Sequence, residues 1–62
     1  YYLLHATRAD LLRRLGRARD ALAHYERAHD LAPSPAERRY LRSRMALQRA
    51  AVPGHAPAAG KP

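Results

Sequence analysis

Four histidines are the side chains best suited to bind a metal ion: His5, His24, His29 and His55. His24 and His29 are five residues apart, so they do not stack on one face of a helix, and the other two lie in different segments. Neither an HExxH motif nor a cysteine accompanies them. We therefore predict no metal or cofactor site. The histidines are interpreted as exposed or packing residues, with His24 spaced to pair with Asp20.

Five carboxylates could supply general acid–base chemistry: Asp10, Asp20, Glu26, Asp30 and Glu37. Asp10 is spaced to pair with Arg13 and Arg14 along a helix, and Glu37 is placed to cap one. An enzyme also needs a cleft in which such groups converge, and three short helices offer none. We predict no catalytic residues and no enzymatic activity.

Eleven arginines and one lysine give the chain a net charge of +7, which indicates an acidic partner, either nucleic acid or protein. Arg38, Arg42 and Arg49 can line one side of the last helix and are the candidate contacts. We expect Tyr25 and Tyr40 in the core, which leaves no interleaved aromatic side chains to stack on bases. A solvated charged face that favours an acidic protein is therefore preferred over direct contact with DNA.

Hydrophobic spacing predicts three helices, at residues 1–15, 18–32 and 35–51. In the first, Leu4, Leu11, Leu12 and Leu15 fall on one side, with Ala9 as a small residue beside them. Gly16 ends this helix, because glycine adopts the left-handed conformation at low cost. The predicted core consists of Leu4, Leu11, Leu15, Leu22, Tyr25 and Ala28, closed on one side by Leu41 and Met45.

The second predicted helix carries a small, large, small pattern along one face. Ala21, Tyr25 and Ala28 are four and three residues apart, so a neighbouring helix can lie close while one ring fills the gap. Pro33 ends this helix. With Gly16 before it, the pattern resembles the second half of the tetratricopeptide repeat, a unit of about 34 residues built from two antiparallel helices.

The start of the third helix has the clearest local signal. Ser34 is the expected N-cap, Pro35 suits the first helical position, and Glu37 completes a capping box. We expect this helix to cap the repeat, with a polar outer face. The predicted architecture is therefore all-α: a tetratricopeptide-like helix hairpin plus a third capping helix.

Two segments divide the chain. Residues 1–51 form the predicted helical domain, and residues 52–62, VPGHAPAAGKP, form a predicted disordered tail rich in proline, glycine and alanine. No apolar stretch approaches the roughly 18 residues that span a bilayer. The lack of cysteine fits a reducing compartment, and we expect a cytoplasmic protein. Because the first residue is Tyr1, we expect a piece of a longer or processed chain.

A narrower resemblance lies in three strings: YYLLHATRADLLRRLGR, ALAHYERAHDLAPSPAERRYL and the arginine-rich last helix. Together, over residues 1–51, they resemble the C-terminal tetratricopeptide-like extension of a bacterial extracytoplasmic-function-type RNA polymerase sigma factor. The resemblance implies a regulatory module that contacts other regions of the same factor or RNA polymerase. It assigns no promoter recognition to these residues, because that family's promoter-binding regions are not among them.

Two other function classes stay open. The chain could be a helical-repeat fragment of an unrelated adaptor or regulator, which the sequence preceding Tyr1 would decide. It could also be a basic peptide that binds nucleic acid, for which a salt titration of binding to random DNA is the test.

Overall fold

Three helices make up the described part of the chain, residues 1–52 of a computed structural model. They are α1 (Tyr2–Arg14), α2 (Ala18–Leu31) and α3 (Pro35–Ala51), and no strand occurs in residues 1–52. The all-α prediction is confirmed, with each helix end within one residue of its predicted place. Of the predicted tail, residues 53–62 lie outside the described residues, and Val52 is the buried C-cap of α3.

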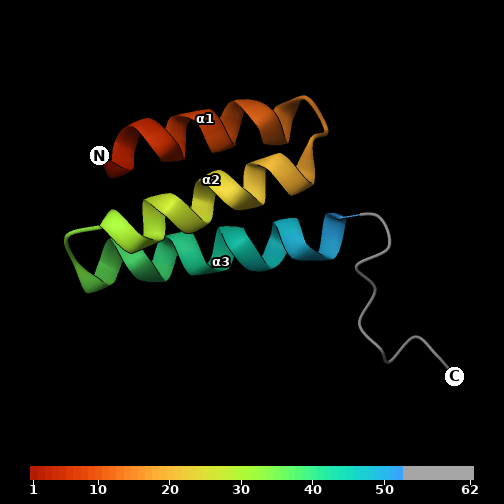
Figure 1. Cartoon of the computed structure of the whole chain (residues 1–62). Helices are drawn as coiled ribbons and strands as arrows, with labels where there is room; N and C mark the ends of the chain where they lie inside the picture. The colour runs from red at the N-terminus through yellow and green to blue at the C-terminus, as the bar shows by residue number, and fades with distance from the viewer. Residues whose placement is uncertain (53–62) are drawn as a thin grey trace, which may run out of the picture.

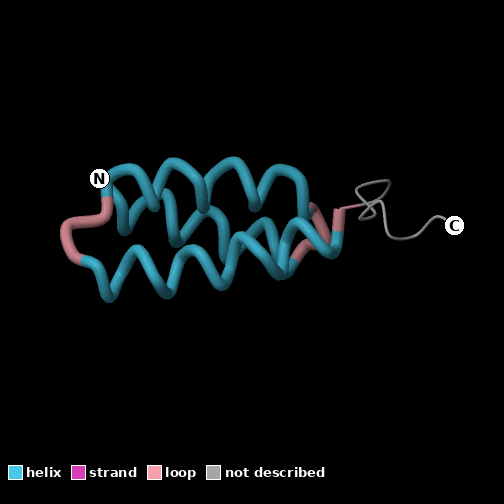
Figure 2. Tube along the Cα trace, turned by 90° about the horizontal axis from the view of Figure 1, so that it is seen from below, coloured by secondary structure: helices cyan, strands magenta, loops and turns pink. Residues whose placement is uncertain are grey.

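The helices follow one another in antiparallel succession, with α2 in the middle of a single layer (Figures 1 and 2). α2 packs against both neighbours, whereas α1 and α3 hardly touch. The start of α1 and the connection between α2 and α3 lie at the same end of the layer (Figure 1). Within residues 1–52, no helix is both long enough and apolar enough to cross a membrane.

Gly16 makes the turn between α1 and α2. Its φ of +78° lies in the left-handed region, where a side chain would be strained. The amide of Gly16 donates to the carbonyl of Arg13, and the amide of Arg17 donates to that of Leu12. These two bonds define a Schellman motif, which satisfies carbonyls that the end of α1 would otherwise leave unpaired. The predicted role of Gly16 is confirmed.

Ser34 begins α3 as its N-cap. Its hydroxyl oxygen accepts a hydrogen bond from the Glu37 amide at 3.3 Å, and Pro35 occupies the first turn. The Ser34 hydroxyl in turn donates to the Glu37 carboxylate. Just before the cap, Ala32 is extended, as the residue that precedes Pro33 should be. The residues that the sequence assigned to this junction therefore have their predicted positions.

Small side chains let α1 and α2 approach closely. Ala9, Ala21 and Ala28 are fully buried, and the ring of Tyr25 fills the space between them at 1% exposure. On the other side of α2, Leu41 and Met45 of α3 complete the core. The predicted stripe of Ala21, Tyr25 and Ala28 is confirmed as the contact surface of α2.

The predicted leucine side of α1 was wrong for three of its four leucines, since only Leu12 packs against the core. Leu4, Leu11 and Leu15 are 48%, 54% and 71% exposed, and α1 instead turns Ala9 toward α2. The physical reason is that the alanines of α2 accept a small residue at close range, and no helix in residues 1–52 covers the opposite side of α1. Tyr40 was also placed wrongly, since it is 51% exposed rather than in the core.

Candidate interaction surface

A stacked pair of histidines joins α1 to α2, which their sequence spacing did not reveal. The ring centroids of His5 and His24 are 5.9 Å apart with an angle of 27° between the ring planes. Both Nδ1 atoms are buried without a hydrogen-bond partner in the structure. Burial, followed by the positive charges of the N-terminus and Arg27, lowers the pKa of His5 below 6.5. The two rings thus stack on each other where α1 meets α2.

Metal binding would need more ligands than this pair. Residues 1–52 hold no group of three or more histidines or carboxylates close enough to bind one ion. Zinc sites use three or four protein ligands. Asp20, which is spaced to pair with His24, pairs instead with Arg17 at 2.8 Å.

Asp10 is held by a buried tyrosine. The Tyr25 hydroxyl donates to Asp10 Oδ1 at 2.6 Å, and the predicted ion pair with Arg13 is longer, at 3.8 Å. Burial raises the pKa of Tyr25 above 10.0, and the hydrogen bond to Asp10 adds to the effect. Asp10 thus anchors α1 to the middle of α2.

Glu37 joins the first and third helices. Its carboxylate accepts hydrogen bonds from the Ser34 hydroxyl and, at 2.8 Å, from the Tyr2 hydroxyl, which is 35 residues away in the sequence. The Ser34 bond and then the Tyr2 bond lower the pKa of Glu37 below 4.5, and the same contact raises the pKa of Tyr2. Asp10 and Glu37 therefore each hold two helices together.

The remaining carboxylates lie near basic side chains. Asp20 pairs with Arg17 within one turn, Glu26 of α2 pairs with Arg49 of α3 at 3.7 Å, and Asp30 lies 3.9 Å from Nδ1 of the neighbouring His29. Each of the five carboxylates thus has a polar neighbour within residues 1–52, and no group of three or more of them gathers at one point there.

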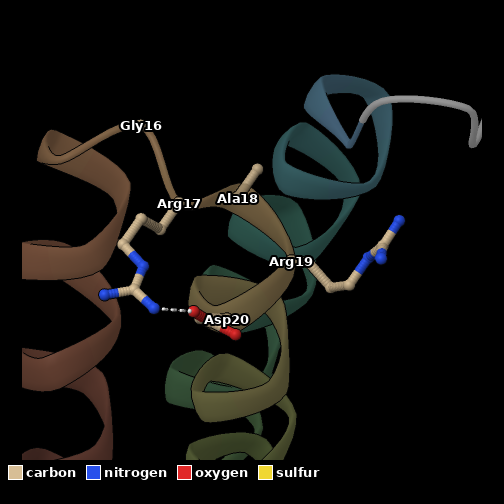
Figure 3. A pocket seen from close by; sticks show the side chains of 5 residues that line it. All are labelled: Gly16, Arg17, Ala18, Arg19 and Asp20. Carbon is tan, nitrogen blue, oxygen red and sulfur yellow. Dashed lines mark ion pairs between the residues drawn. The ribbon is translucent and has the colours of Figure 1, made fainter.

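A shallow depression lies at the turn after α1 (Figure 3). Its five lining residues are consecutive in the sequence: Gly16, Arg17, Ala18, Arg19 and Asp20. In Figure 3 Arg17 and Asp20 face each other and form their ion pair, while Arg19 extends to the other side. A hollow built by one turn, whose single carboxylate is already paired, lacks the convergent groups of a catalytic site.

The three candidate arginines of α3 lie on one side of that helix, as their spacing of four and seven residues requires. Two of them have intramolecular partners. Arg38 donates to the carbonyl of Ala32 at 2.9 Å, which ties α3 to the end of α2, and Arg49 pairs with Glu26. Arg42 is exposed and has no ion pair or side-chain hydrogen bond within residues 1–52.

Tyr40 and Arg44 form an exposed pair that the sequence interpretation missed. The Arg44 guanidinium lies 5.4 Å from the centre of the Tyr40 ring, and its Nε donates to the Tyr40 hydroxyl at 3.1 Å. The hydrogen bond with Tyr40 raises the pKa of Arg44 above its ordinary value. Their spacing of four residues was the available signal, because it places the two side chains next to each other on a helix surface.

No protein-family model matches this chain, and neither the curated proteins nor the solved structures include a match to it.

Proposed function

We propose that this chain is a protein–protein interaction module, and specifically the regulatory helical extension of a bacterial extracytoplasmic-function-type sigma factor. Its partner would be another region of the same factor or RNA polymerase. The general part of this proposal draws on the surface of the three helices. The specific part draws on the resemblance of residues 1–51 to that extension.

The observation that best supports a protein–protein interaction module is the number of large apolar side chains exposed to solvent. Within residues 1–52, eight of them are exposed: Tyr1, Leu3, Leu4, Leu11, Leu15, Leu31, Tyr40 and Leu47. The larger apolar side chains buried in the same residues are Tyr25, Leu41, Met45 and Val52. A chain that exposes more large apolar groups than it buries presents surface suited to covering by a partner.

The layer arrangement supports the same proposal. Because α2 lies between α1 and α3, each outer helix keeps a long side that faces solvent (Figure 1). Helical-repeat proteins use such extended surfaces to bind other proteins. The excess of arginine favours a partner with negative charge.

The sigma-factor assignment predicts that promoter-binding regions precede Tyr1 in the longer protein. The test is in vitro transcription with three forms of that protein: intact, truncated before Tyr1, and truncated after Ala51. We expect removal of the helices to change transcription and removal of the following residues to leave it unchanged. Equal activity of the first two forms refutes the regulatory role. If the form truncated after Ala51 loses its transcriptional activity, the functional segment lies after Ala51.

Nucleic-acid binding is the second candidate, and the exposed Tyr40–Arg44 pair favours it. An aromatic ring beside a guanidinium can stack on a base while the cation contacts phosphate. Binding of the chain to random single-stranded and duplex DNA should be measured across a salt series. Binding that weakens steeply with salt and falls in Tyr40→Ala supports this candidate, whereas no binding at low salt excludes it.

A further inference from the structure

One side of α1 presents leucines to solvent along most of its length. Leu4, Leu11 and Leu15, which we call the leucine stripe, are seven and four residues apart and follow one line along the helix. They are about half exposed or more, as given above. At 1.5 Å per residue the stripe is about 16 Å long, which matches three turns of a second helix.

Arginines border the stripe on both sides. By helix geometry Arg8 lies on one flank and Arg14 on the other, and both are exposed. The single carboxylate of α1, Asp10, is occupied by the Tyr25 hydroxyl and Arg13. With two arginines at its border and the carboxylate of α1 already held by other partners, the border of the stripe is net positive.

The length of the leucine stripe and the positive charge of its border indicate the kind of partner that would fit it. We propose that the leucine stripe binds the apolar side of an acidic amphipathic helix of another protein. Leucines of the partner would cover Leu4, Leu11 and Leu15, while its flanking glutamates or aspartates would meet Arg8 and Arg14. The proposal specifies the interaction module proposed above and is independent of its assignment to a sigma factor.

A second copy of the chain is a poorer occupant. Each copy carries a net charge of +7, and pairing two stripes would bring the arginine borders of both copies together. Like charges held close across an interface oppose association. Nucleic acid matches the charge but offers no apolar side to cover the leucines.

The test uses the whole 62-residue chain and two synthetic helical peptides. Both peptides carry leucines three and four residues apart, and their flanking positions are glutamates in one and lysines in the other. Binding is followed by amide chemical shifts at low salt, up to about 1 mM peptide. We expect the glutamate peptide to shift amides of α1 and the lysine peptide to leave them unchanged.

Two matched variant pairs locate the contact. Leu11→Gln should weaken binding about five- to tenfold, whereas Leu47→Gln, which changes an equally exposed leucine of α3, should stay within about twofold. Arg8→Glu should weaken binding more than Arg39→Glu, although both change the net charge equally, and the difference should shrink as salt rises. Circular dichroism of each variant confirms that the helices are retained.

Several results would overturn the proposal. These are no binding of the glutamate peptide at the highest concentration, equal binding of the lysine peptide, and shifts confined to α3. A dimer in sedimentation that Leu11→Gln dissociates would assign the stripe to a second copy, and shifts of α1 amides by duplex DNA would assign it to nucleic acid. A negative transcription assay leaves this proposal standing, because the peptide experiment does not involve the polymerase.

Discussion

Removing the hydroxyl of Tyr25 tests how α1 is fixed on α2. Tyr25 is 1% exposed, and its hydroxyl donates to Asp10 at 2.6 Å. Tyr25→Phe removes one oxygen and keeps the ring, so the variant loses the hydrogen bond while the packing of the alanines around it stays the same. The prediction therefore isolates one polar contact between two helices.

The expected loss follows from the charge and exposure of the acceptor. A hydrogen bond to a charged group contributes about 1.5–3 kcal/mol. Asp10 is 40% exposed, so water can replace part of the lost bond and the carboxylate is not left unsatisfied. We expect Tyr25→Phe to lower the free energy of unfolding by about 1–2 kcal/mol, around and below the lower end of that range. In a domain of this size that corresponds to roughly 5–15 °C in Tm.

Tyr40→Phe is the matched control. Its hydroxyl accepts from Arg44 on an exposed surface, and its loss should change the free energy of unfolding by about 0.5 kcal/mol at most. Both variants and the parent are melted at pH 7 by far-UV circular dichroism, with sucrose added equally to all if the folded baseline is short. Equal losses in the two variants, or no loss in Tyr25→Phe, would refute the reasoning. Asp10→Asn completes a double-mutant cycle, in which the two changes should be non-additive.

Three further predictions concern packing and the α3 cap. Ala28→Leu should cost about 1–3 kcal/mol by overpacking, and Ala23→Leu on the exposed side of α2 should cost much less; similar urea midpoints would contradict the packing. Ser34→Ala should cost about 0.5–2 kcal/mol, more than Ser43→Ala, as measured by helix content and Tm. Since Glu37 has a lowered pKa in the fold, its contribution to stability should be complete above pH 4.5 and be lost as the pH falls below 4.5 and through the lower pKa of the folded state. This acid loss should shrink in Ser34→Ala, and an unchanged pH profile would argue against the cap.

Helix ends could be predicted from the sequence because their causes are local. Gly16 is placed by backbone sterics, and Ser34 and Glu37 act over one turn. The side of α2 that contacts its neighbours could also be predicted from the sequence. Ala21 and Ala28 are small enough to let a neighbouring helix approach α2 closely. The large ring of Tyr25 lies between them, and pointing it elsewhere would leave a gap in this contact.

The rotation of α1 about its axis could not be read from the sequence. The helix has two candidate contact sides, one with leucines and one with Ala9, and hydrophobicity alone favours the leucines. The contacts that decide between them join residues far apart in the chain. The stacking of His5 on His24 and the bond from Tyr25 to Asp10 depend on how two helices meet, which periodicity within one helix does not contain.

The rotation of α1 also explains why its leucines are exposed. Turning the leucines toward α2 would swing Asp10 away from the Tyr25 hydroxyl and Tyr2 away from Glu37. The orientation with alanine inside keeps both bonds and leaves the leucine stripe in water. Burying a leucine side chain is worth about 1.5–3 kcal/mol. The three leucines of the stripe are only partly exposed, so covering each recovers roughly half of that value or more. The total folding free energy of a chain of this length is about 3–9 kcal/mol, so the gain on binding is a substantial fraction of it. A partner that covers the stripe should therefore raise the Tm of the chain as well as bind it, because a ligand that binds only the folded state stabilises that state.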